Sequence, residues 1–97
     1  MQNESLRDTI DESEIKVRIH KFILTKLLEG EDPINLTDDT PLVSGGVIDS
    51  LNSLKVGLFL EKAFSITLLP EELSDPENLE TIAAMTKLVT AKLQQFR

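Results

Sequence analysis

The stretch that decides the fold is Gly45-Gly46-Val47-Ile48-Asp49-Ser50-Leu51-Asn52-Ser53-Leu54, in which a polar loop runs into an apolar, helix-forming segment. Two adjacent glycines permit the tight or left-handed backbone that such a junction requires. Asp49 and Ser50 both belong to the residue types that cap a helix by accepting a hydrogen bond from its first turn. Because a helix N-terminus also favours negative charge, a phosphate esterified to Ser50 would be stabilised there. The rest of the sequence has to distinguish a capping serine from a modified one.

The segment from about Ser50 to Phe64 is predicted to be the central helix, because it is apolar over most of its circumference. Four of its residues are spaced i, i+3, i+7 and i+10 and therefore share one face: Asn52, Lys55, Phe59 and Lys62. Spacing alone leaves two interpretations open for this face. Phe59 is either a core residue beside a solvated edge, or the exposed aromatic of a docking surface between two lysines.

Residues 11–28 carry the pattern of a long amphipathic helix. Asp11 followed by Glu14 predicts its N-terminal cap. Apolar side chains then recur on one stripe, which consists of Ile15, Ile19, Phe22, Ile23 and Leu27 and is widened by Leu24 and Leu28. Gly30 is expected to end this helix, and the stop is reinforced by Glu31-Asp32-Pro33.

Residues 31–49 form a connection longer than most helix-to-helix loops, and such connections are usually functional or disordered. Six apolar residues are expected to pin it to the core as an ordered loop: Ile34, Leu36, Leu42, Val43, Val47 and Ile48. Residues 65–69 are predicted to form a loop because no second strand is available to pair with them. Pro70 to Ser74 predicts one short helical turn that begins with proline.

A last helix is expected from about Asn78 or Leu79 to the end of the chain. Its apolar stripe consists of Ile82, Met85, Val89, Leu93 and Phe96. The predicted fold class is therefore all-α. We expect a small four-helix bundle with a long loop between the first and second helices and a short third helix.

Composition indicates one globular domain, because 40% of the 97 residues are hydrophobic and 28% are charged. The net charge of −7 argues against nucleic acid, whose phosphates would repel the surface. No apolar run is long enough to cross a bilayer, and no secretory leader is recognisable. We therefore expect a cytoplasmic monomer without membrane insertion, in which residues 1–10 form a flexible tail and residues 11–97 form the domain.

Catalytic and metal-binding patterns are absent from the sequence. The chain has no cysteine, which removes thiolate nucleophiles and thiolate metal ligands. Its single histidine, His20, is expected to be a surface or boundary residue of the first helix. The carboxylates of Glu31, Asp32, Asp38 and Asp39 do not follow the ligand order of a calcium-binding EF-hand. We expect neither a metal site nor an enzymatic activity of the chain's own.

Several segments read together resemble the acyl and peptidyl carrier proteins, over roughly residues 12–95. These segments are Thr40-Pro41-Leu42, Gly46-Val47-Ile48-Asp49-Ser50-Leu51, the apolar helix to Glu61-Lys62-Ala63-Phe64, Ile66, Pro70-Glu71-Glu72 and Leu79-Glu80-Thr81-Ile82. The resemblance implies a bundle of the acyl-carrier-protein type and a phosphopantetheine-binding carrier domain over residues 11–97. Length, acidity, helix order and the long loop agree with it.

The resemblance implies that Ser50 receives 4'-phosphopantetheine from coenzyme A through a magnesium-dependent phosphopantetheinyl transferase. The arm would end in the thiol that this chain lacks and would hold an acyl or aminoacyl group as a thioester. Asp49 matches the acidic residue before the serine, and Leu51 matches the apolar residue after it. Asp49 is then the better candidate for the helix cap, which leaves the hydroxyl of Ser50 free. The implied partners are the transferase, a loading ligase or acyltransferase, and a downstream synthase, oxidase or transferase.

By analogy with the family, partners would contact the second helix and the loop before it, at Val47, Ile48, Leu51, Asn52, Lys55, Leu58, Phe59 and Lys62. Fatty-acid carriers typically bear carboxylates there, whereas this face has lysines, which suit a neutral or acidic partner. The pattern therefore favours a free-standing carrier of specialised metabolism, of the polyketide or nonribosomal peptide type. The alternatives are a carrier of fatty-acid synthesis and, from a different class, an unmodified helical adaptor in which Ser50 is only a cap.

Overall fold

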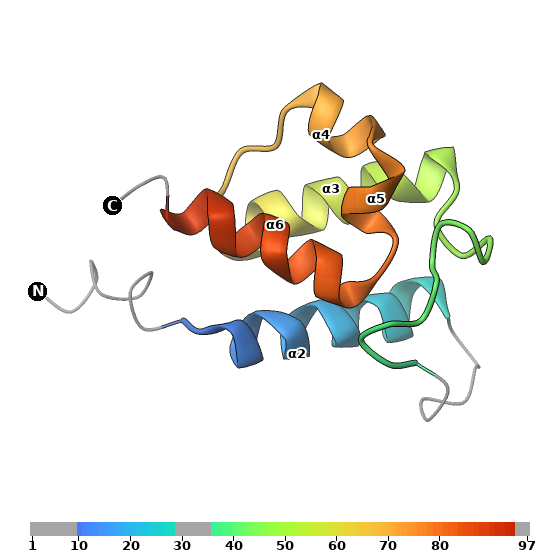
Figure 1. Cartoon of the computed structure of the whole chain (residues 1–97), viewed down its shortest axis with the longest axis horizontal. Helices are drawn as coiled ribbons and strands as arrows, with labels where there is room; N and C mark the ends of the chain where they lie inside the picture. Colours follow the sequence, from blue (N-terminus) through green and yellow to red (C-terminus); the bar gives the residue numbers. More distant parts are fainter. Residues whose placement is uncertain (1–9, 29–35, 95–97) are drawn as a thin grey trace, which may run out of the picture.

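A computed structural model describes residues 10–28 and 36–94 (Figure 1). Every regular element in these two ranges is helical, which confirms the all-α class. The elements are α2 (Glu12–Phe22), the π-helical segment η1 (Ile23–Leu27), α3 (Ser50–Phe64), α4 (Pro70–Ser74), α5 (Pro76–Leu79) and α6 (Ile82–Gln94). Four features of the sequence analysis lie outside the described residues: the predicted helix stop at residues 30–33, the apolar Ile34, Phe96, and residues 1–9 of the predicted tail.

The start of α2 follows from its sequence. Asp11 Oδ1 accepts a hydrogen bond of 3.0 Å from the amide of Glu14, which confirms the predicted cap. The carboxylate of Glu14 instead pairs with Arg18 at 3.0 Å, one turn further along. The stripe continues into η1, so that Ile15, Ile19 and Ile23 are all buried.

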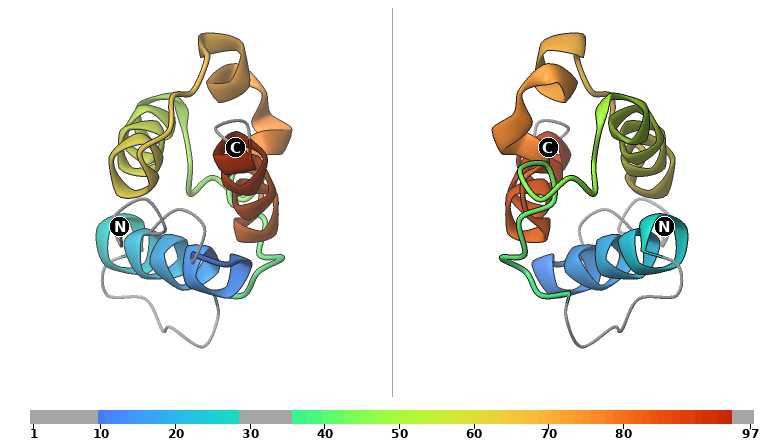
Figure 2. Two further views of the ribbon diagram at one scale, coloured as in Figure 1. Left: turned by 90° about the vertical axis from the view of Figure 1, so that its left-hand side faces the viewer. Right: turned by 90° about the vertical axis from the view of Figure 1, so that its right-hand side faces the viewer.

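Three longer helices enclose the core (Figures 1 and 2). The helix α6 runs alongside α2 in the opposite direction, and α3 lies on the other side of the bundle from α6. The short helices α4 and α5 cover the side away from α2. The buried apolar side chains come from the three longer helices, from η1 and α5, from the loop before α3 and from the connector after it: Ile15, Ile19, Ile23, Leu36, Leu42, Ile48, Val56, Leu60, Phe64, Ile66, Leu68, Leu79, Ile82, Met85, Val89 and Leu93.

The last helix begins later than predicted. Asp75 Oδ1 accepts from the amide of Glu77 at 3.0 Å and starts the separate four-residue helix α5. Thr81 Oγ1 then accepts from the amide of Ala84 at 3.0 Å and provides a new N-terminal cap. The described chain therefore has two short helices between α3 and α6, where the sequence analysis predicted one, and α6 starts at Ile82.

A buried ion pair ties α4 to α6. Lys92 on α6 is 7% exposed, and its Nζ lies 2.7 Å from Glu72 Oε1 on α4. The same carboxylate oxygen accepts from the amide of Leu69 at 2.7 Å. This amide, followed by Lys92, holds the pKa of Glu72 below the ordinary value of a glutamate.

We predict that Glu72→Gln lowers the free energy of unfolding at neutral pH by about 2 kcal/mol, because the buried Lys92 ammonium loses its counter-charge. Urea titration followed by circular dichroism measures this loss. Since the pKa of Glu72 is lowered by folding, the stabilisation is present at neutral pH and disappears as the pH falls through that pKa. Glu71→Gln, on the exposed side of the same helix, is the control and should change stability by less than about 0.5 kcal/mol. Equal losses in both variants would contradict this account.

Candidate functional site

The loop that leads into α3 is anchored by Leu42. The carbonyl oxygen of Leu42 accepts from the amides of Val47 at 2.8 Å and Ile48 at 2.9 Å, which closes a tight turn. The side chains of Leu42 and Ile48 are buried, as is that of Leu36 earlier in the loop. The prediction of an ordered loop pinned to the core is therefore confirmed for its described part, residues 36–49.

The two glycines of this turn are required for different reasons. Gly46 has φ of 85°, in the left-handed region that side-chain-bearing residues rarely adopt. A Cβ atom on Gly45 would collide with the carbonyl oxygen of Pro41, which lies against it. The Gly-Gly pair thus lets the chain reverse direction immediately before the first turn of α3.

Asp49 caps α3. Its Oδ1 accepts from the amide of Asn52 at 2.8 Å, and its carbonyl oxygen accepts from the amide of Ser53 at 2.8 Å. Asn52 in turn donates from Nδ2 to the carbonyl oxygen of Val47 at 3.0 Å, which fixes the loop against the helix. The assignment of the cap to Asp49 is confirmed, and α3 has its predicted bounds, Ser50–Phe64.

Ser50 is the exposed first residue of α3. No residue that the structure describes is hydrogen-bonded to its hydroxyl oxygen. Its carbonyl oxygen accepts from Ser53 Oγ at 2.7 Å, one turn further on. The hydroxyl of Ser50 is therefore accessible for chemistry at the positive end of a 15-residue helix.

Glu80, at the junction of α5 and α6, holds the loop in a way that the sequence analysis missed. Its Oε1 accepts from the amides of Val43 at 3.1 Å and Ser44 at 2.9 Å, and its Oε2 accepts from Ser44 Oγ at 2.5 Å. Its carbonyl oxygen also accepts from the amide of Leu42 at 2.7 Å. These partners lie 36 or more residues away, so no local pattern could have indicated them.

The hydroxyl of Ser44, followed by its amide, holds the pKa of Glu80 below the ordinary value of a glutamate. We predict that the amide proton resonance of Ser44 titrates with this lowered pKa, because protonation of Glu80 removes the acceptor charge. The loop contacts are thus complete at neutral pH and weaken as the pH falls through the folded pKa. A pH series of ¹H–¹⁵N spectra measures this shift. In Glu80→Gln the acid titration of that resonance should vanish, and its persistence there would assign it to another carboxylate.

Only some residues of the predicted partner face are exposed to solvent. Leu51 and Leu58 are exposed by 64% and 59%, and Leu54, which the sequence analysis left out, is exposed by 58%. These three residues form the leucine ridge of α3. Their i, i+3, i+7 spacing is the sequence signal that could have found Leu54. Ile48 does not belong to this face, because it is 3% exposed and packs into the core.

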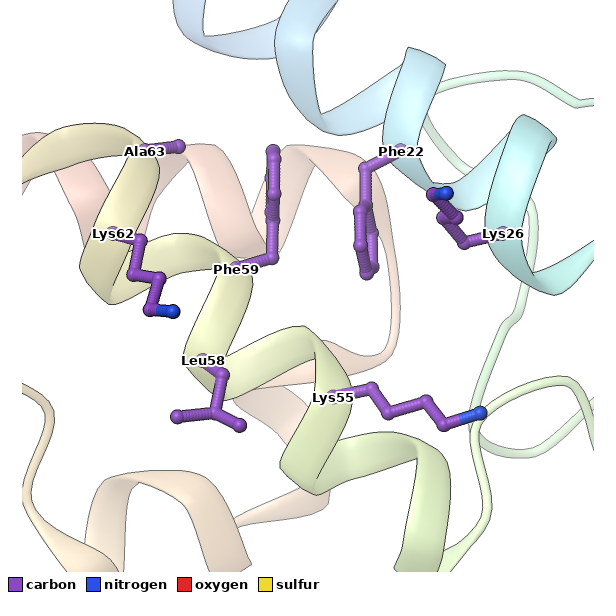
Figure 3. A pocket seen from close by; sticks show the side chains of 7 residues that line it. All are labelled: Phe22, Lys26, Lys55, Leu58, Phe59, Lys62 and Ala63. Atoms are coloured by element: carbon purple, nitrogen blue, oxygen red, sulfur yellow. The ribbon is translucent and has the colours of Figure 1, made fainter.

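Phe59 packs against the phenyl rings of Phe22 and Phe64. Its ring stacks on Phe22 of α2 with 4.2 Å between centroids, and it meets Phe64 edge-on at 6.1 Å. Phe59 is therefore half-buried, between the two interpretations: it packs against the core but also lines a surface groove. The neighbouring Lys55 and Lys62 are exposed, as predicted. Both line a shallow groove together with Phe22, Lys26, Leu58, Phe59 and Ala63 (Figure 3).

Of the remaining candidate residues, Glu31 and Asp32 lie outside the described residues, and His20 has a structural contact. His20 Nε2 donates to the carbonyl oxygen of Leu36 at 3.1 Å and so binds the loop to α2. Within residues 10–28 and 36–94, no group of three or more potential metal ligands comes together. None of the helices in these ranges has the length and apolar character needed to span a membrane. No protein-family model matches the sequence, and no curated protein sequence matches it significantly.

Proposed function

We propose that this chain is a free-standing carrier protein that holds an acyl or aminoacyl group as a thioester on a 4'-phosphopantetheine arm attached to Ser50. The observation that carries the proposal is that Asp49, and not Ser50, caps the start of α3. Asp49 caps the helix, so the Ser50 hydroxyl stays exposed and is not hydrogen-bonded to any described residue. The motif that resembles the carrier proteins surrounds this same serine.

The surroundings of Ser50 fit a phosphodiester. The amides of Ser50 and Leu51 have no hydrogen-bond acceptor among the described residues, so the end of the helix can offer both to an anion. Oδ1 of Asp49 is already engaged by an amide of the same turn. The loop on the other side is fixed by Leu42 and Glu80, so the attachment point is rigid.

The proposed modification transfers phosphopantetheine from coenzyme A to the hydroxyl oxygen of Ser50. The hydroxyl oxygen of Ser50 forms a bond to the phosphorus next to the pantetheine in coenzyme A. The bond from that phosphorus to the bridging oxygen breaks, 3',5'-ADP leaves, and the transferase or solvent takes the hydroxyl proton. When bound, the arm supplies a thiol, which this cysteine-free chain does not contain. The chain itself supplies the tether and the surface that partner enzymes recognise.

The charges near the site support a role in specialised metabolism over fatty-acid synthesis. Lys55 and Lys62 are exposed on α3, where fatty-acid carriers typically bear carboxylates. A loading ligase or acyltransferase and a downstream synthase, oxidase or transferase would then be matched to this face. We place the proposed carrier in the cytoplasm, as a monomer.

Incubation with coenzyme A, magnesium and a promiscuous phosphopantetheinyl transferase should add one phosphopantetheine to the wild-type chain, measured by intact-mass spectrometry. Ser50→Ala should add none, because it lacks the nucleophilic hydroxyl. Ser53→Ala is the matched control, since it removes a serine one turn away and should be modified. An unmodified wild-type chain would favour the unmodified helical adaptor, and addition that persists in Ser50→Ala would rule out Ser50 as the attachment site.

The leucine ridge should govern recognition by the transferase. We predict that Leu54→Asp lowers kcat/KM for phosphopantetheine transfer by about fivefold or more, which corresponds to the loss of an apolar contact worth about 1 kcal/mol. Val17→Asp is the control, because Val17 is 64% exposed but lies on α2, away from the ridge. Both variants should keep wild-type circular dichroism. Equal rates in both variants would remove the ridge from the proposed site.

A further inference from the structure

The groove between α2 and α3 has an apolar floor and a basic rim. The stacked rings of Phe22 and Phe59 join the two helices across the floor (Figure 3), and Leu58 also lines the groove. Lys26 of η1 and Lys55 of α3 lie at the end beyond Phe22. Lys62 lies at the other end, beyond Phe59. The groove thus has cations at both ends of an aromatic floor.

These cations are not neutralised by the described part of the chain. No carboxylate lines the groove, and none of its lysines forms an ion pair with a described residue. Outside the groove, Lys16, Arg18 and Lys92 each have a carboxylate within 3.2 Å, whereas Lys21 and Lys87 form no ion pair with a described residue. The whole chain has 17 acidic residues against 10 Lys and Arg, so an unpaired basic cluster runs against its overall charge. Grouped like charges repel one another and are relieved by an anionic ligand.

We propose that this groove docks an acidic amphipathic helix of a partner protein. The inference rests on the proposed function, because it names the chemistry of the partner that would bind the face beside Ser50. Apolar side chains of the docking helix cover Phe59 and Leu58, and its carboxylates meet the lysines at the rim. The acidic chain as a whole would attract a basic partner, whereas this groove binds an acidic one.

The spacing of the lysines indicates the pattern of the docking helix. Lys55 and Lys62 are seven residues apart on α3, which corresponds to about 10.5 Å along the helix axis. A helix that lies along α3 therefore meets both lysines with acidic residues at positions i and i+7. Apolar residues at i+3 and i+4 of such a helix face the floor between them. Leu58 belongs to both the groove and the leucine ridge, so the docked helix adjoins the surface that leads to Ser50.

The test is a selection of helical peptides from a phage-displayed library on immobilised Ser50→Ala protein, followed by measurement of Kd by fluorescence anisotropy. We expect the recovered peptides to carry Asp or Glu at i and i+7 around apolar residues. Their Kd for the double variant Lys55→Glu/Lys62→Glu should rise by about tenfold or more, because attraction becomes repulsion at both ends of the groove. Binding should also weaken as salt is raised.

Lys21→Glu/Lys87→Glu is the control, because it changes the net charge equally at two exposed lysines outside the groove. It should alter Kd by less than about twofold, since those charges are screened from the groove. Recovery of basic or neutral peptides, recovery of none, or equal weakening by both double variants would each overturn the proposal. Use of Ser50→Ala throughout makes the result independent of phosphopantetheine transfer, which mass spectrometry measures separately.

Discussion

The double hydrogen bond to the carbonyl oxygen of Leu42 is the constraint on which the candidate site depends. It closes the turn before α3, while the buried side chain of Leu42 fixes that turn to the core. Glu80 holds the same turn from the other side, through its carbonyl oxygen and its carboxylate. Loops are usually more mobile than helices, but several backbone amides of this loop donate hydrogen bonds to Leu42 and Glu80. The position of Ser50 is consequently set by packing on both sides.

The capping of α3 by Asp49 separates two roles that a serine at a helix start commonly combines. If Ser50 capped the helix, its hydroxyl would be engaged by an amide, and esterification would weaken the helix end. With Asp49 in that role, a group attached to Ser50 leaves the first turn intact. Asn52 reinforces this arrangement by joining the loop to the helix through Val47. The local structure is thus compatible with the attachment of a group to Ser50.

The net charge of the chain and the charge of its candidate partner surface differ in sign. The net charge of −7 governs long-range attraction, whereas short-range contacts depend on the residues that line each surface. Around Phe59 those residues are lysines, and the nearby leucine ridge is uncharged. The charged side chains that line this groove are therefore opposite in sign to the net charge of the chain. An acidic partner would therefore have to be oriented toward this groove to be attracted, because the rest of the chain would repel it.

The helices and the local parts of the site could be predicted from the sequence, because their signals lie within a few residues. The caps at Asp11 and Asp49 arise from contacts three residues long, and the turn at the left-handed Gly46 is closed by hydrogen bonds that span at most six residues. Some local signals were still missed: the cap at Thr81 divides the last helical segment, and it had the same short-range origin as the others.

Tertiary structure decided the rest. Nothing near Ser44 indicates Glu80, 36 residues away, because that contact exists only once the bundle has formed. Helical spacing placed Phe59 and Lys55 on one face, but it could not show which of them a second helix covers. The sequence by itself thus indicated where α2 and α3 begin and offered Asp49 as the cap of α3. Only the fold, which brings α2 against α3 and α6 against the loop, decided which surfaces stay exposed.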